Sequence, residues 1–251
     1  MSDPVSAIRP LTKTAALAEL EPWVRGGGRH YVCFCEASLY ASATRRPDVA
    51  AALAKADLVL ADGIGVFWLA ALKRRRVPER VPGPSFLLAA CEYGVARGFR
   101  HFFLGGAEGV AERLAQRLQA QFPGLVVVGC HSPPFRPLSE AEEAATKTLI
   151  ATAKPDILWV GLGSPKQELW MAQHVGQIDV PVMLGVGAAF DFHSGVRAWA
   201  PAWVRRAGLE WAFRTFTGGW RVFRRNLGCV TILAWCLVKA GIARGTGRGA
   251  G

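Results

Sequence analysis

Six short apolar segments constrain this chain more than any other feature of its sequence. Each is a continuous apolar run, without the alternation of a strand that has one face in water, so both faces of the sheet must be covered. Helix-forming segments separate the runs, and parallel strands need such crossover connections. The pattern predicts a doubly wound, mostly parallel α/β sheet. We expect its strands at residues 29–35, 57–61, 100–106, 125–130, 156–163 and 180–187.

The pattern changes near residue 196, which predicts a division of the chain at that point. We expect an α/β domain over residues 1–196, of which 1–28 form an N-terminal helical extension. Residues 197–251 predict a basic, aromatic-rich helical appendage with a disordered end. Nine Arg and Lys239 oppose the single acid Glu210 in that segment, so +9 of the net charge of +11 falls there.

The appendage has the composition of a segment that binds an anionic membrane surface. Its apolar stretch, 229–238, has only ten residues, whereas a helix that crosses a bilayer needs about 20. Aromatic residues beside Arg at helical spacing therefore predict a helix that lies on the membrane without crossing it. The alternative is a helical pair that packs on the core or on another subunit. Nucleic acid is disfavoured as a partner, because the charge is confined to a segment rich in Trp and Leu.

The cysteines and the first residues of the chain predict its compartment. The six cysteines form no C-x-x-C pair, which favours buried or idle thiols in a reducing compartment. Residues 1–20 contain no apolar run of the secretory kind. We therefore expect a cytoplasmic protein that is peripheral on the inner face of the cell membrane.

Polar residues and glycines follow several of the expected strands. In a doubly wound sheet, ligands bind beyond the carboxyl ends of the strands, so Asp62, Gly105, the turn 161–167 and the segment 185–191 should share one edge. The turn has glycines before a helix start, as phosphate-binding turns do, with donors from Lys166 and Gln167. Asp62 is either a cap for a helix or the acid–base group of an enzyme.

Two further residues near that edge have a functional and a structural interpretation. Arg80 lies in a proline-flanked loop just before a helix, where its guanidinium can clamp a diphosphate, or it is a solvated surface residue. Asp191 can accept hydrogen bonds from ribose or sugar hydroxyls, or it closes a turn on its own backbone. The G-x-G at 185–187 lacks the third glycine of a dinucleotide fingerprint, so an NAD-dependent oxidoreductase is a weak alternative.

Several blocks in fixed order resemble one family of enzymes. They read ADGIGVFW, ERVPGPSF, FFLGGAEGVAERLAQRL, WVGLGSPKQELW, GVGAAFDFHSG and APAWVRRAGLEWAFR. They are similar to the WecG/TagA/CpsF glycosyltransferases, glycosyltransferase family 26, over about residues 30–225. The resemblance implies a Rossmann-like α/β fold with a C-terminal helical appendage. It also implies inverting transfer of a sugar from a UDP-sugar to a polyprenyl-diphosphate-linked saccharide, in exopolysaccharide or other cell-surface polysaccharide synthesis.

The resemblance assigns roles to residues of this chain. It implies that Asp62 is the catalytic general base. For the donor and its nucleotide it implies Gly105, Phe135, Gly163, Gln167 and Asp191. For the acceptor and its diphosphate it implies Arg80, Cys35, Arg214 and Arg221. One departure concerns the end of the first strand, where Cys33 and Cys35 stand in place of the family's common Thr and Asn. A thiol lacks the donor and acceptor set of an amide.

The remaining expectations concern cofactors and partners. No D-x-D pair occurs in the chain, which agrees with a reaction that needs no metal or other cofactor. The expected partners are a UDP-sugar, a lipid-linked acceptor and an anionic membrane surface, whereas the donor sugar and any homo-oligomer stay open. A third possible function is that of a membrane adaptor, if the chain is an inactive relative of the family. Cys33 and Cys35, which replace the family's common Thr and Asn, leave this alternative open.

Overall fold

A computed structural model describes residues 3–217 together with 236 and 238. In this part of the chain, one sheet of six strands has the order β2-β1-β6-β5-β3-β4. All of its strand pairs are parallel, which confirms the predicted α/β class. The strands lie within two residues of their predicted bounds. They are β1 His30–Cys35, β2 Leu58–Ala61, β3 Arg100–Gly105, β4 Val126–His131, β5 Ile157–Gly161 and β6 Val182–Gly185.

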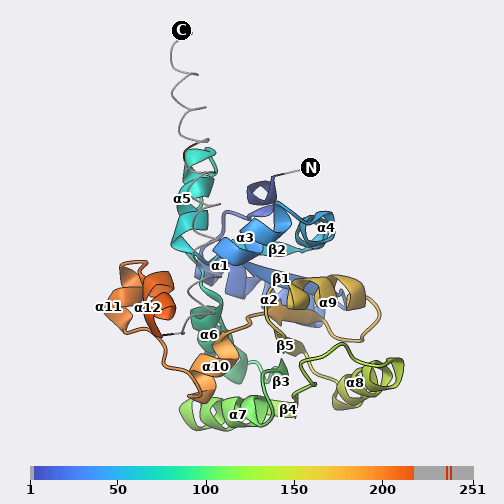
Figure 1. The fold of residues 1–251 in the computed structure, drawn as a ribbon. Helices are drawn as coiled ribbons and strands as arrows, with labels where there is room; N and C mark the ends of the chain where they lie inside the picture. Colours follow the sequence, from blue (N-terminus) through green and yellow to red (C-terminus); the bar gives the residue numbers. More distant parts are fainter. Residues whose placement is uncertain (1–2, 218–235, 237, 239–251) are drawn as a thin grey trace.

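Helices cover both faces of the sheet, as the continuous apolar runs require (Figure 1). One face carries α1 Lys13–Ala18, α2 Leu20–Arg25, α6 Gly83–Val95, α7 Val110–Gln121 and α10 Ala189–Ser194. The other carries η1 Pro4–Ala7, α3 Ala37–Ala43, α4 Pro47–Lys55, α5 Ile64–Leu72, α8 Glu140–Ala153 and α9 Lys166–His174. Each face has its own buried core.

Successive side chains of a strand point to opposite faces, and β1 divides its residues between the two cores in this way. Val32 and Phe34 belong to the core under α6 and α7, whereas Cys33 and Cys35 belong to the core under α3 and α5. The register pairs Cys35 with Ala61 of β2, and Cys33 with Gly185 of β6. The segments that come after β1, β2 and β6 therefore leave the sheet at one edge.

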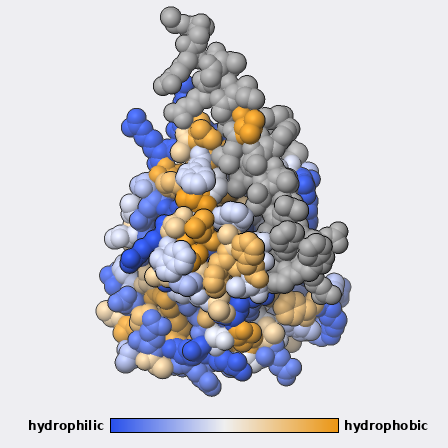
Figure 2. Space-filling model, turned by 60° about the vertical axis from the view of Figure 1, so that its left-hand side comes forward, coloured by the Kyte–Doolittle hydropathy of each residue, from blue (hydrophilic) through white to orange (hydrophobic). Residues whose placement is uncertain are grey.

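The first part of the predicted appendage contains two short helices. These are α11 Ala202–Arg206 and α12 Glu210–Thr217, which lie at one side of the α/β domain in Figure 1. Large apolar side chains are exposed on them, among them Trp203, Trp211 and Phe216. Figure 2 shows apolar residues between charged ones on this side of the molecule. The predicted membrane helix around 229–238 lies almost wholly outside the described residues.

A helix that crosses a bilayer needs about 20 predominantly apolar residues. Within residues 3–217 and at 236 and 238, no helix is both long and apolar enough to cross a bilayer.

Candidate active site

A polar cavity of about 140 Å³ lies at the carboxyl edge of the sheet, where β1, β2, β5 and β6 end. We call it the carboxylate cavity, because Glu36, Asp62 and Glu210 all line it. Its other lining residues are Phe34, Ser38, Pro84, Gly163, Ser164, Gln167, Gly185, Val186, Gly187, Ala188 and Phe192. The structure thus brings together three predicted site residues, Asp62, Gly163 and Gln167, from the ends of two strands that are not neighbours.

Asp62 follows β2 directly and is held on both sides. Its backbone N–H donates to the carbonyl of Cys35 at 3.0 Å. Its Oδ2 accepts from the N–H of Gly83 at 3.0 Å, which satisfies a donor in the first turn of α6. The next helix, α5, begins after Gly63 and has no side-chain cap. Asp62 is therefore a cap, but for a helix that starts 21 residues later, and it still lines the cavity.

Gly83 packs closely against two residues of the site. A Cβ at that position would lie 3.3 Å from Cγ of Phe34, which is a tight contact, and 3.6 Å from Oδ2 of Asp62, which is an ordinary one. The start of α6 therefore packs directly against the Asp62 carboxylate.

Arg80 connects the Asp62 turn to α11. Its Nη1 donates to the carbonyl of Asp62 at 3.4 Å, and its Nη2 donates to the carbonyl of Arg205 at 2.7 Å. It also lines a second cavity of about 310 Å³, which we call the arginine cavity. The remaining lining residues are Pro82, Ser85, Trp199, Ala202, Arg205, Arg206 and Glu210. Glu210 lines both cavities, so they adjoin.

The lining of the arginine cavity includes four residues that were not predicted as site residues, Trp199, Arg205, Arg206 and Glu210. The guanidinium of Arg205 stacks over the ring of Trp199, 3.6 Å from its centroid. Nε1 of Trp199 donates to Glu210 at 3.1 Å, which holds the ring in place. Arg206 is exposed beside them. The adjacent arginines of the APAWVRRAGLEW block were a signal, but only the fold shows that they line the same cavity as Arg80.

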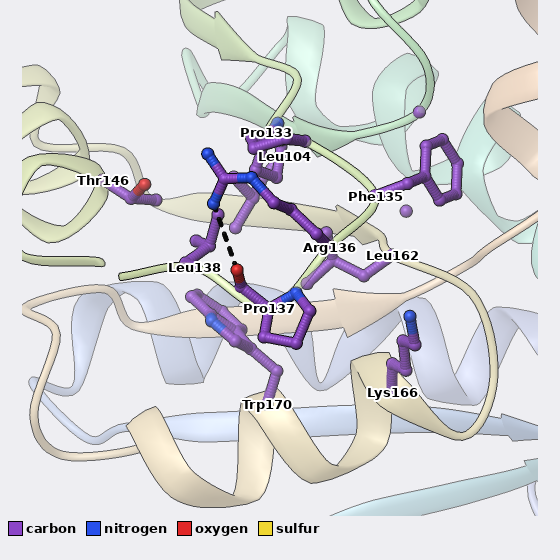
Figure 3. A pocket seen from close by; sticks show the side chains of 13 residues that line it. Leu104, Pro133, Phe135, Arg136, Pro137, Leu138, Thr146, Leu162, Lys166 and Trp170 are labelled. Atoms are coloured by element: carbon purple, nitrogen blue, oxygen red, sulfur yellow. Dashed lines mark hydrogen bonds between the residues drawn. The ribbon is translucent and has the colours of Figure 1, made fainter. Parts of the chain in front are cut away.

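A third cavity of about 290 Å³ lies where β3 and β5 end, and we call it the aromatic cavity. Figure 3 shows Trp170 and Lys166 extending from α9 toward the loop that carries Phe135, Arg136 and Pro137. The rest of the lining is Leu104, Gly106, Pro133, Pro134, Leu138, Thr146, Gly161 and Leu162. Phe135 is 76% exposed. Phe135 therefore lines a cavity, and its predicted contact with the nucleotide stays a prediction.

The predicted phosphate-binding turn forms a wall between two cavities. Gly161, Leu162 and Lys166 line the aromatic cavity, whereas Gly163 and Gln167 line the carboxylate cavity. The turn leads into the first turn of α9, whose backbone N–H groups carry partial positive charge. A ligand that occupied both cavities would have to pass this turn.

Gln167 and Glu168 are both buried at the start of α9. Nε2 of Gln167 donates to Oε1 of Glu168 and to the carbonyl of Gly185, each at 2.8 Å. Burial raises the pKa of Glu168 to about 7, although hydrogen bonds from Gln167 and Ser164 act in the opposite direction. Glu168 was not predicted as a site residue, because an acid in the first turn of a helix is ordinarily an exposed residue that complements the helix dipole.

Gly105 and Asp191 lie near the cavities without lining them. Gly105 has φ +130°, and a Cβ there would lie 2.5 Å from the carbonyl carbon of Gly161, so it allows β3 and β5 to approach closely. Asp191 is half-buried in the first turn of α10. Its carbonyl accepts from the N–H of Arg197 at 3.0 Å. This contact uses the main chain of Asp191, so both interpretations of its carboxylate stay predictions.

Among the remaining predicted acceptor residues, the structure describes the side chain of Cys35, which does not line the carboxylate cavity. Cys35 is fully buried in the core on the opposite side of β1. Burial raises the pKa of both the Cys33 and Cys35 thiols well above the ordinary range, so they are neutral. The expected contact of Cys35 with the acceptor therefore gains no support from the geometry. The side chain of Arg214, on α12, and the whole of Arg221 lie outside the described residues.

A doubly wound parallel sheet with a polar cavity at the carboxyl ends of its strands defines a Rossmann-like α/β protein with a ligand site at its edge. The family model described as "Glycosyl transferase WecG/TagA/CpsF family" matches residues 5–246. The chain belongs to this family, and it is a glycosyltransferase. The resemblance noted in the sequence is confirmed.

Curated relatives agree with that assignment. The chain is 32% identical over 185 residues to an N-acetylglucosaminyldiphosphoundecaprenol N-acetyl-beta-D-mannosaminyltransferase of Bacillus spizizenii. This match covers 74% of the chain and 70% of the relative. A protein of the same name from Staphylococcus aureus is 27% identical over 186 residues, with the same coverage of both chains.

Proposed function

We propose that this enzyme moves a sugar from a UDP-sugar to a polyprenyl-diphosphate-linked saccharide, with inversion, in the synthesis of a cell-surface polysaccharide. The names of the two relatives describe transfer of N-acetylmannosamine to a lipid-linked N-acetylglucosamine, which supports this class of donor sugar and acceptor. The observation that carries the proposal is the meeting of Asp62 and Gln167 in one cavity that adjoins a cluster of arginines.

Asp62 acts as the general base in this proposal. The acceptor hydroxyl attacks the anomeric carbon of the donor sugar while Asp62 accepts the hydroxyl proton. The bond from that carbon to the diphosphate oxygen breaks on the opposite face, and UDP departs with the electron pair. General-base assistance of this kind is typically worth about 10²–10⁴ in rate. The hydrogen bond from Gly83 holds the carboxylate at the cavity.

The aromatic cavity suits the nucleoside of the donor. Phe135 and Trp170 supply flat apolar surfaces, and Lys166 supplies a cation near the turn that separates the two cavities. The N-terminus of α9 and Lys166 would stabilise the charge that grows on the leaving diphosphate. The donor sugar would then lie past the turn, beside Gln167, within reach of Asp62.

The arginine cavity suits the diphosphate of the acceptor. Arg80, Arg205 and Arg206 line it, and guanidinium groups bind phosphate oxygens in a bidentate manner. The cavity adjoins the carboxylate cavity through Glu210, so an acceptor held there can present its sugar hydroxyl to Asp62. The exposed Trp203, Trp211 and Phe216 of α11 and α12 would dock the protein on the cytoplasmic leaflet.

A transfer assay tests this function. The purified full chain is given a panel of UDP-sugars and a short-chain prenyl-diphosphate-linked N-acetylglucosamine, and both UDP release and the anomeric configuration of the product are measured. We expect acceptor-dependent UDP release and an inverted product, with the rate unchanged by a metal chelator. Absence of transfer with every donor, while the protein is folded, would contradict the proposal.

A further inference from the structure

The amide of Gln167 is held in one orientation by two acceptors. Its Nε2 donates to the carboxyl of Glu168 and to the carbonyl of Gly185. A reversed amide would place its carbonyl oxygen against both of these oxygens, so the observed orientation is strongly favoured. Oε1 of Gln167 therefore points the other way. That atom is buried and has no hydrogen-bond partner among the described residues.

The unpartnered oxygen lies at the wall of the carboxylate cavity. A Cβ on Gly187, which lines this cavity, would be 3.2 Å from Oε1 of Gln167. Burying an acceptor without a donor costs free energy of folding. Such an atom in a folded protein therefore calls for a structural or functional explanation. The neighbouring ligand in the proposed function is a sugar, whose hydroxyl and amide N–H groups are donors.

Glu168, which accepts a hydrogen bond from the Gln167 amide, is an unusual carboxyl because it is buried. It is fully buried, and its Oε2 has no hydrogen-bond partner among the described residues. The titratable groups that face it are the thiols of Cys33 and Cys35 on β1 and the carboxyl of Glu36, which follows β1. β6 and α4 also pack on α9, and their buried residues are apolar. α8 meets the other end of α9, where Glu143 contacts His174. None of the titratable groups that face Glu168 is a cation.

We propose that Glu168 is a positioning residue for sugar transfer: its carboxylate fixes the Gln167 amide so that Oε1 accepts a hydrogen bond from a hydroxyl or amide N–H of the bound sugar. This inference rests on the proposed function, because the donor on Oε1 is a sugar. A protonated Glu168 is a weaker acceptor for Nε2 and holds the amide less firmly, although the carbonyl of Gly185 still accepts from Nε2 in either form. Ionised Glu168 is then the active form, and its pKa of about 7 places the change near neutral pH.

The Gln167 side-chain amide reports on this arrangement without any substrate. In the ¹⁵N-labelled full chain, assigned with Gln167→Ala, we expect its NMR signal to shift between pH 5.5 and 8.5 with a midpoint near 7. Glu168→Gln should abolish the shift, and the exposed control Glu92→Gln should retain it. A signal that is independent of pH in the unaltered protein, or that shifts equally in Glu168→Gln, would overturn the proposal.

The transfer reaction supplies a second readout. Glu168→Gln mimics the protonated acid, so transfer at pH 8 should fall about tenfold, as expected for one hydrogen bond, and its rise with pH between 6 and 8 should disappear. In a Gln167→Ala background the same substitution should have no further effect, whereas a merely structural role would give additive losses. If the unaltered protein transfers no sugar, the proposed function fails, and the NMR titration alone decides the positioning role.

Discussion

The carboxylate cavity and the aromatic cavity lie at the same edge of the sheet, and they differ in what holds their walls. In the carboxylate cavity, Asp62 is fixed by hydrogen bonds to Cys35 and Gly83, and Gln167 is fixed by Glu168 and Gly185. The aromatic cavity has one wall on α9, but its other wall is a proline-rich loop whose Phe135 is 76% exposed.

This difference fits the two tasks that we propose for the cavities. Acid–base chemistry needs a group held close to its productive position before the substrate arrives. Capture of a nucleoside tolerates an aromatic ring that settles on the base only after binding. We therefore expect changes in the carboxylate cavity to affect turnover, and changes in the aromatic cavity to affect donor affinity.

Asp62→Asn should give the largest effect. It tests whether the carboxylate cavity serves turnover and the aromatic cavity serves donor binding. The amide keeps the shape of the side chain and can still accept from Gly83, but it cannot take the acceptor proton. We expect kcat to fall by about 10²–10⁴, while the Kd for UDP, measured by calorimetry, changes less than twofold. If Asp62→Asn weakens UDP binding as much as it slows transfer, the two cavities do not have separate tasks.

Glu168→Gln should have a pH-dependent effect on stability that is separate from its effect on transfer. Burial raises the pKa of Glu168 to about 7 in the folded protein, so the folded state binds more protons than the unfolded state between about pH 4.5 and 7. The stability that Glu168 contributes is therefore present at low pH and is lost as the pH rises through 7. Above pH 8 the ionised, buried carboxyl costs about 3 kcal/mol.

Thermal unfolding at several pH values measures this loss of stability. Relative to the unaltered protein, Glu168→Gln should gain Tm as the pH rises from 5 to 8, by roughly 5–10 °C for a chain of this size. Glu92→Gln, an exposed acid on α6, serves as the control and should show no such trend. A Tm difference that stays constant over this range would mean that Glu168 does not change its ionisation when the protein unfolds.

Arg206→Ala tests the arginine cavity, which adjoins the carboxylate cavity. Arg206 is the last residue of α11. Loss of one guanidinium from a diphosphate site should raise the KM for the lipid-linked acceptor by about tenfold. The KM for the UDP-sugar should stay within a factor of two. Arg113→Ala, an exposed arginine on α7, is the matched control. Equal increases in both KM values would assign Arg206 to the donor instead.

The sequence predicted the sheet well because each strand is a local signal. Continuous apolar runs can only be buried strands or helices, and their lengths decided between the two. The shared edge was also predictable, since parallel strands place their carboxyl ends together. Asp62 and Gln167 meet for this reason, although 105 positions separate them in the chain.

Contacts that depend on tertiary packing were beyond prediction. Arg80 meets Arg205, 125 positions away, through a segment that comes after the last strand and has no local signal for where it packs. From the sequence, Glu168 has the position of an exposed acid in the first turn of a helix, and only the packing of α9 on the sheet shows that it is buried. Cys35 was expected at the site because the family resemblance implied it, but the alternation of side chains along β1 places its thiol in the core under α3 and α5.

Phe135→Ala should give the smallest effect. It tests whether the aromatic cavity serves donor affinity. The ring is exposed in the free protein, so its loss should change Tm by about 1 °C or less. A stacked nucleobase would lose roughly 1 kcal/mol, which raises the KM for the UDP-sugar about fivefold and leaves kcat nearly unchanged. Phe135→Tyr should restore the affinity, and Leu149→Ala, an exposed apolar residue on α8, should have no effect. A fall in kcat with an unchanged KM would instead mean that the loop closes over the reacting sugars, and the two cavities would then share one task.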